Sequence, residues 1–393
     1  MHLQQPPSSP TVGRSTPVLQ VAARAAIGVP LTGRRRAVPP YHHVMAPSFP
    51  TRFDSTLDLA RLPWFELRGG NHLVIAEDAV DDVGPVIDMH THLAMGFFRR
   101  LRIDLDAETP AVAHYLPVTL PVDLDVYSNQ NLDASAMFAM KADVSVLGLT
   151  GQGMRTTHTA PNLVREMKAL GIESAVVLPF DLPVGARNSD SLLRVARRYP
   201  ELLPFGSVHP WDRDIDDRLD RQRSTGALGI KLHPNGQFIS PDAPRTVHLC
   251  GRCGAKGLPV LFHCGPVGIE PAAARRRSQV DRYERTIAEN PDTTFVLGHS
   301  GALQYERAVQ FADRYPNTFF ELSCLGLPAL RTVLDTVPAD RILYGTDWPF
   351  YHQALTLARV LIATADDPAL RRAVLHDNAA RLLSLDRAAA GGD

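Results

Sequence analysis

The segment Val86-Ile-Asp-Met-His-Thr-His92 begins the pattern that determines the fold. Its apolar start followed by His90 and His92 predicts a buried strand, in which side chains two residues apart point the same way. The two imidazoles would therefore converge on one point. A neutral imidazole is the commonest metal ligand in proteins, whereas an isolated His-x-His is also compatible with a histidine-rich turn. The rest of the chain has to decide between a metal site and such a turn.

Seven further apolar runs follow this segment, separated by amphipathic stretches with helical spacing. Continuous apolar strands that alternate with amphipathic helices are typical of a parallel sheet covered by helices. Eight such units within about 300 residues predict an α/β fold of the (β/α)8, or TIM barrel, type. An open doubly wound sheet is the alternative, but no Gly-x-Gly-x-x-Gly follows the first run. The later runs are residues 174–180, 203–208, 228–233, 259–263, 294–299, 318–323 and 341–347.

Three regions depart from this repeat, which itself extends over residues 86–388. Residues 1–50 hold 9 of the 32 prolines, five arginines and no acidic residue, a composition that predicts a disordered tail. Residues 51–85 include the stretch FELRGGNHLVIAED, which predicts a Gly-Gly-Asn hairpin in a small N-terminal flap. Residues 93–160 are too long for an ordinary connection, so we expect an insertion that forms a lid or subdomain over the barrel mouth.

The bulk composition excludes several classes of protein. With 41 basic and 42 acidic residues, the net charge of −1 gives no electrostatic basis for binding nucleic acid or an anionic membrane. No segment approaches the roughly 18 to 20 apolar residues that span a bilayer. Four cysteines are too few for a disulfide scaffold and indicate a reducing, cytoplasmic setting. The partner that we expect is a small-molecule substrate.

Side chains suited to metal or substrate chemistry stand at the C-terminal ends of five of these runs. In a (β/α)8 barrel the C-terminal ends of all eight strands meet at one face, where active sites form. A single histidine at a strand end is usually structural, but five strands that each deliver such a group to one face predict a shared metal site. The residues are His90, His92, Lys231, His233, His263, His299 and Asp347.

The motifs around these residues resemble those of the amidohydrolase superfamily. The similarity is to the branch that includes aminocarboxymuconate-semialdehyde decarboxylase and related metal-dependent hydrolases. Neither the first 85 residues nor the insertion at 93–160 is covered by the resemblance. The matching motifs are DMHTH (88–92), GIKLHP (229–234), FHCG (262–265), LGHSG (297–301), YGTDWPF (344–350) and LHDNAARLLSL (375–385).

The resemblance implies one divalent metal bound by His90, His92, His263 and Asp347. It also implies that Asp347 transfers protons and that His299, next to the ligands, is a second catalytic residue that orients a water or polarises the substrate. Three imidazoles and one carboxylate suit Zn²⁺ with a position left open for water, and a water bound there can reach a pKa near 7. Mn²⁺ is an alternative metal.

Lys231 and His233 are the residues expected to bind the substrate, and a buried, hydrogen-bonded structural role is the alternative for His233. Lys231 would pair with a substrate carboxylate as a point charge. In some superfamily members a lysine on this strand is carboxylated and bridges two metals, so a two-metal site is the alternative. Asp88 and Thr91 are either partners that orient the ligands or ordinary strand-end residues.

Two reactions fit the same set of ligands. In the first, a hydrolase uses metal-activated water to cleave a C–N or C–O bond of a small, carboxylate-bearing substrate. In the second, a non-oxidative decarboxylase acts on an aromatic or enol carboxylate. Lys231 in GIKLHP and the motifs as a whole fit the broad group of hydrolases better than the decarboxylases, so the sequence favours the hydrolase. A metal-binding protein without catalytic activity is a third hypothesis. The intact set of histidines and Asp347 argues against it, because a relative that had lost its activity would be expected to lack at least one ligand. The resemblance also implies a homo-oligomer, most simply a dimer.

Overall fold

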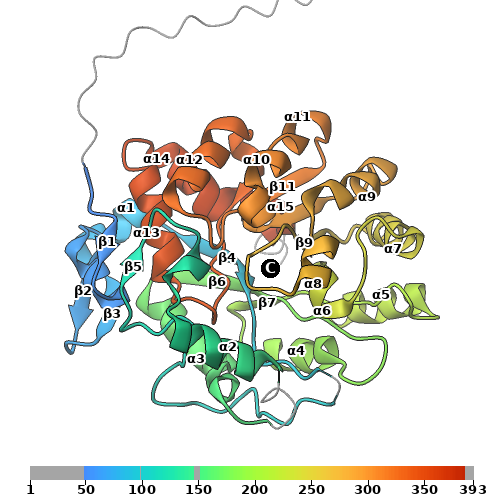
Figure 1. Ribbon diagram of the computed structural model, residues 1–393, viewed down its shortest axis with the longest axis horizontal. Coiled ribbons are helices and arrows are strands. Elements are labelled where there is room, and N and C mark those ends of the chain that lie inside the picture. Colours follow the sequence, from blue (N-terminus) through green and yellow to red (C-terminus); the bar gives the residue numbers. More distant parts are fainter. Residues whose placement is uncertain (1–47, 98, 146–150, 386–393) are drawn as a thin grey trace, which may run out of the picture. The chain divides into compact units, whose positions relative to one another are not determined.

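Eight parallel strands surround a common centre in the computed structural model, which describes residues 48–97, 99–145 and 151–385 (Figure 1). Each strand coincides with one of the eight predicted runs. The predicted tail, apart from residues 48–50, lies outside the described residues. The strands are β4 (Val86–Thr91), β6 (Ile172–Val177), β7 (Leu202–Pro204), β8 (Ile230–Leu232), β9 (Val260–His263), β10 (Phe295–Gly298), β11 (Thr318–Glu321) and β12 (Ile342–Leu343).

Two parallel sheets make up this ring, and backbone hydrogen bonds bridge both seams between them. One sheet has the order β4-β6-β7 and the other β12-β11-β10-β9-β8. At the seam between β4 and β12, the amide of Met89 donates to Tyr344 O (2.9 Å) and that of Asp347 to His90 O (2.8 Å). At the other seam, the amide of Lys231 donates to Gly206 O (2.8 Å). The predicted (β/α)8 barrel is confirmed.

Amphipathic helices cover the outside of the ring (Figure 1). In α3, for example, Leu163 and Met167 lie four residues apart on one buried face, while Lys168 is exposed. The last helix, α15 (Asn378–Leu383), instead packs against the interior cluster of the ring. The other helices from residue 160 onward are α3 (Ala160–Ala169), α4 (Asn188–Ala196), α5 (Ile215–Ser224), α6 (Pro234–Gln237), α7 (Pro244–Ala255), α8 (Ala272–Arg277), α9 (Glu284–Glu289), α10 (Tyr305–Ala308), α11 (Phe311–Arg314), α12 (Leu327–Thr336), α13 (Ala354–Ala363) and α14 (Pro368–Arg372).

Apolar side chains fill the interior of the ring, and a bulge in β4 modifies this filling near the mouth. Ile87 and Met89 pack in the same buried cluster as Leu261 and Val296. The register between β4 and β6 shifts between Asp88 and Thr91, so that β4 carries one extra residue there. If side chains alternated strictly along β4, Met89 would face the interior and His90 would face outward. The bulge allows His90 to face the interior as well.

The N-terminal region forms two small antiparallel sheets, one by itself and one with the insertion. β2 (Phe65–Arg68) and β3 (His72–Ile75) form the predicted hairpin, in which Arg68 lies opposite His72. β1 (Arg52–Phe53) pairs antiparallel with β5 (Val122–Asp123), which belongs to the insertion. α1 (Val80–Val83) leads into β4.

The described part of the insertion contacts loops at the C-terminal ends of three strands. It includes α2 (Ala134–Ser145) and a short 3₁₀ turn, Ser128–Asn131. Asn129 Nδ2 donates to Val267 O after β9 (3.0 Å). The backbone amide of Leu116 donates to Phe350 O after β12 (2.9 Å), and that of Ser128 to Cys324 O after β11 (2.9 Å). The insertion therefore packs at the end of the barrel where the polar strand ends meet.

Within the three described ranges, no helix combines the length and apolar character needed to cross a bilayer.

Candidate metal centre

The ends of β4 and β12 bring two histidines and a carboxylate together. His92 Nε2 lies 3.3 Å and His90 Nε2 lies 3.7 Å from Asp347 Oδ1. The three ligand atoms all lie within 4.8 Å of one another, and all three residues are buried. Residues more than 250 positions apart in the chain thus converge as the strand-end pattern predicts, because β4 and β12 are neighbours in the ring.

The Nδ1 atoms of both histidines are engaged by hydrogen bonds, so their Nε2 atoms, of which that of His90 lies 3.1 Å from Lys231 Nζ, are the ones that can act as ligands. His92 Nδ1 lies 2.8 Å from Leu178 O, so it carries the proton and donates. His90 Nδ1 lies 2.7 Å from Glu321 Oε2 in the same arrangement. Burial, together with the neighbouring Lys231, holds the pKa of His90 well below its ordinary value, so this ring is neutral. A neutral imidazole protonated at Nδ1 presents a lone pair at Nε2.

His263 and His299 extend this cluster from β9 and β10. His263 Nδ1 lies 3.1 Å from His299 Nε2, and His299 Nδ1 lies 2.7 Å from Ser323 Oγ. His263 Nε2 is buried without a hydrogen-bond partner among the described residues, a rare condition that needs an explanation. Burial, with His299 next to it, holds the pKa of His263 well below its ordinary value. A neutral ring with a free nitrogen fits a metal ligand, although His263 lies outside the tight group formed with Asp347.

Glu321, at the end of β11, organises the cluster and was not predicted from the sequence. Its carboxylate accepts hydrogen bonds from His90 Nδ1 (2.7 Å), the amide of His299 (3.0 Å) and Ser323 Oγ (2.8 Å). Burial raises its pKa to about 8. A carboxylate behind a ligand histidine fixes the orientation and tautomer of the ring. The signal available in the sequence was a glutamate inside the otherwise apolar run TFFELS, since glutamate is almost never fully buried unless it is paired.

The backbone is strained at three residues of the cluster. His299, Cys324 and Asp347 have φ values of 59°, 68° and 63°, in the left-handed region that non-glycine residues rarely adopt. The Cys324 thiol donates to Asp347 Oδ2 (3.5 Å). Strained residues persist only where the surrounding structure holds them, and they concentrate at functional sites.

Asp88 and Thr91 act on the barrel rather than on the ligand side chains. Asp88 accepts hydrogen bonds from Thr346 Oγ1 (2.5 Å), Gln353 Nε2 (2.7 Å) and the amide of His90 (3.0 Å). Thr91 Oγ1 donates to Val176 O (2.8 Å). Asp88 therefore ties β4 to the loop after β12, which is the structural one of the two roles considered for it.

The two predicted substrate-binding residues lie on the same face of the barrel. Lys231 is fully buried on β8, and its Nζ lies 3.1 Å from His90 Nε2. Burial lowers its pKa to about 7, although Asp347 and Glu321 act in the opposite direction. His233 stacks on His263, with ring centroids 4.2 Å apart, and its Nδ1 accepts from the amide of Gly236 (3.2 Å). Its Nε2 is thus the atom available to a substrate.

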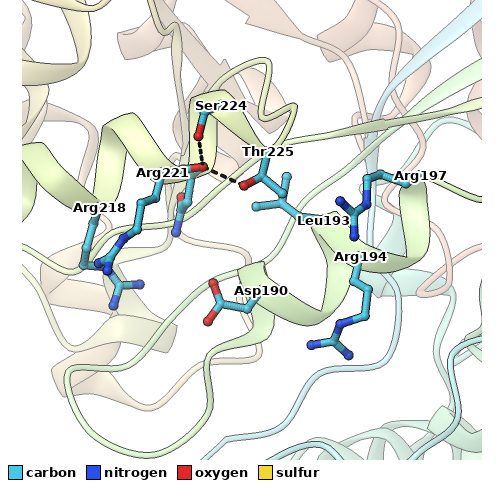
Figure 2. A pocket seen from close by; sticks show the side chains of 9 residues that line it. Asp190, Leu193, Arg194, Arg197, Arg218, Arg221, Ser224 and Thr225 are labelled. Carbon is cyan, nitrogen blue, oxygen red and sulfur yellow. Dashed lines mark hydrogen bonds between the residues drawn. The ribbon is translucent and has the colours of Figure 1, made fainter.

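A surface cavity of about 420 Å³ lies away from this cluster, between α4 and α5 (Figure 2). None of the predicted site residues lines it. Its walls carry Asp190, Arg194, Arg197, Arg218 and Arg221 from the two helices. The candidate metal centre is therefore recognised from its side chains, and this cavity is not part of it.

Comparison with known proteins gives matches over most of the barrel. The family model described as "Amidohydrolase" matches residues 87–385. A 4-sulfomuconolactone hydrolase of Hydrogenophaga intermedia is 25% identical in an alignment of length 253 that covers 56% of this chain and 77% of that protein.

Solved structures are similar to this chain in fold. An uncharacterised TIM-barrel protein of Bordetella bronchiseptica has a TM-score of 0.54 at 20% identity, with 77% of this chain and 99% of that chain covered. A 2,6-dihydroxybenzoate decarboxylase from Rhizobium has a TM-score of 0.50 at 17% identity, with 76% and 99% covered. At these identities the structural matches establish the TIM-barrel architecture alone.

Proposed function

The chain belongs to the amidohydrolase family, and on that premise we propose that it is a metal-dependent hydrolase of small, carboxylate-bearing lactones. The observation that carries the proposal is the convergence of the Nε2 atoms of His90 and His92 on one carboxylate oxygen of Asp347. The lactone class is suggested by the curated relative, which is named as a lactone hydrolase. Related amide and ester substrates would require the same attack on a carbonyl carbon.

The proposed metal ligands are His90, His92, His263 and Asp347. Two tests support their fit to a single divalent cation, most simply Zn²⁺. The donor set of neutral imidazoles with one carboxylate suits zinc, and the buried Nε2 of His263 has no partner in the described chain. The cation would supply an acidic water and polarise the carbonyl.

The remaining roles fall to side chains around the ligands. Asp347 takes a proton from the attacking water and returns it to the oxygen that leaves when the lactone ring opens. His299, held by Ser323 at Nδ1, presents Nε2 toward His263 and can hold or orient a water there. Lys231 and His233 bind the substrate. An anion beside Lys231 would favour the charged form of an amine whose pKa burial lowers to about 7.

The test is a substrate panel with metal-loaded protein. Muconolactone, simple amides and esters, and aromatic carboxylates are each assayed for proton release and for CO₂ release. Lactone opening with proton release and no CO₂ is the expected result. Release of CO₂ from an aromatic or enol carboxylate would instead identify a decarboxylase and refute the proposal. Zinc measured at about one per chain, and lost when His90 and His92 are both replaced by alanine, would support the ligand assignment.

A further inference from the structure

The cavity between α4 and α5 is lined by an excess of positive charge, since four arginines and one acidic residue, Asp190, form its walls (Figure 2). On the α4 side, Arg194 and Arg197 lie three positions apart. On α5, Arg218 and Arg221 have the same spacing. Residues three apart are neighbours on a helix surface, where like charges destabilise the helix. Two pairs of like charges therefore line one cavity, and an anion between the two helices would stabilise them.

Three of these four guanidinium groups have no partner among the residues that the structure describes. Arg218 is engaged, because its Nη2 donates to the buried Asp181 Oδ2 (3.0 Å). The side chains of Arg194, Arg197 and Arg221 make no hydrogen bond or ion pair within the described ranges, not even with Asp190 in the same cavity. All three residues are exposed, so a ligand from solution can reach them.

A neighbouring surface cavity of about 460 Å³, between α3 and the segment that follows α4, shows a different condition. Each of the three basic residues that line it has a carboxylate partner. The arginines between α4 and α5 are therefore not unpaired merely because they lie on the surface. The ion pairs of the neighbouring cavity are Arg165–Glu108 (3.2 Å), Lys168–Glu201 (3.3 Å) and Arg198–Asp106 (2.5 Å).

The size and charge of the cavity indicate the kind of anion that fits it. Its volume of about 420 Å³ lies within the range of about 300–1,000 Å³ that is typical of small-molecule sites. A phosphate group carries about −1.5 to −2 charges near neutral pH, so two such groups are needed to offset three guanidinium groups. Arginine also suits phosphate because its planar fork donates two parallel hydrogen bonds to phosphate oxygens.

We propose that this cavity binds a diphosphate, whose two phosphate groups bridge the arginines of the α4 side and those of α5. The recognised group is the diphosphate itself, whether it is free or carried by a nucleoside diphosphate. None of the proposed metal ligands lines the cavity, so the proposal is independent of the proposed function.

The test is calorimetric titration of the full chain with pyrophosphate at an ionic strength of about 0.15 M, where exposed charges are screened beyond about 8 Å. One pyrophosphate per chain should bind with a Kd below about 1 mM and raise the melting temperature. Arg194→Gln and Arg221→Gln, one on each wall, should each weaken binding about tenfold or more, because each removes hydrogen bonds to a charged group. Arg165→Gln is the matched control, since it removes the same charge from the neighbouring cavity. It should leave the affinity unchanged.

ADP is titrated in parallel to distinguish the two sources of a diphosphate. Equal affinities for ADP and pyrophosphate would support recognition of the diphosphate alone, and tighter binding of ADP would support a nucleotide as its carrier. Failure of both to bind at about 1 mM would overturn the proposal. An equal loss of affinity in Arg165→Gln, or full affinity in either Arg194→Gln or Arg221→Gln, would also overturn it, because the anion would then not bridge the two walls.

Discussion

Replacing Glu321 by glutamine tests whether this buried carboxylate prepares His90 to bind a metal. The glutamine carbonyl can occupy the Oε2 position and accept from His90 Nδ1, the amide of His299 and Ser323 Oγ. The amide nitrogen then faces the backbone N–H of Ser323, which Oε1 now accepts. The variant keeps the geometry around His90 but cannot acquire the negative charge that Glu321 carries above its pKa of about 8, so the two proteins are compared above that pH.

Two effects of different size follow from this exchange. Hydrogen bonds to charged groups contribute about 1.5–3 kcal/mol and neutral ones about 0.5–1.5 kcal/mol. The difference, about 1–1.5 kcal/mol, corresponds to a roughly tenfold weaker metal affinity, at the lower end of the 10- to 100-fold typical of such partners. The facing N–H groups at Ser323 should lower the free energy of unfolding of the metal-free protein by about 1–3 kcal/mol.

The assay is competition for Zn²⁺ with a chromophoric chelator, together with thermal unfolding of the metal-free protein. Asp143→Asn is the matched control, because Asp143 is also a buried carboxylate with several donors, including Tyr115 and the amide of Met154, but contacts no proposed ligand. It should lower stability without weakening zinc binding. An unchanged zinc affinity in folded Glu321→Gln, or an equal loss in Asp143→Asn, would refute the reasoning.

Four further changes probe the centre and its support. His263→Asn should reduce zinc from about one per chain to near zero by elemental analysis, because it removes the free Nε2; full retention would exclude His263 as a ligand. Asp347→Asn should lower kcat for the panel substrate at least about a hundredfold, and a smaller loss would argue against its proton transfer. Burial lowers the pKa of His158 to about 4 from 6.5, so the unfolded state binds more protons between these values and the free energy of unfolding rises with pH across that window. His158→Gln should flatten this part of a denaturation series, and an unchanged slope would contradict the assignment. Arg359→Met should lower the free energy of unfolding by about 3 kcal/mol in urea titrations, since it leaves Leu124 O and Ser128 Oγ without their donor, whereas a change below about 0.5 kcal/mol would show that the anchor is unimportant.

The strands, and the meeting of the candidate ligands at one end of the barrel, were predictable because their signals are local. Each strand is an apolar run, and His90, His263 and Asp347 stand at run ends that the barrel topology brings to one face. Glu321 was missed because its significance depends on a contact with His90, 231 positions away, which no local pattern records. The β4 bulge was missed for a related reason, since an extra residue in a strand is visible only against its neighbour.

The insertion could be located from the sequence but not interpreted in chemical terms. Its length alone indicated that it is more than a connection. Its segment Leu124–Ser128 carries no motif, and the position of that segment depends on hydrogen bonds that Arg359 donates to Leu124 O, Val126 O and Ser128 Oγ. Such an anchor involves residues more than 230 positions apart and becomes apparent only when both are folded together.

The seam between β4 and β12 has a consequence for how the protein is made. His90 lies on the first strand of the ring and Asp347 follows the last, and their backbones are joined where the ring closes. A ribosome-bound chain therefore cannot bring the proposed ligands His90 and Asp347 together until nearly the whole barrel has emerged. Metal loading would then be a late step that selects finished molecules. A cation at a thousandfold excess over its Kd would raise the free energy of unfolding of the closed barrel by about 4 kcal/mol. When metal is scarce, the first effect would therefore be that less of the protein resists proteolysis.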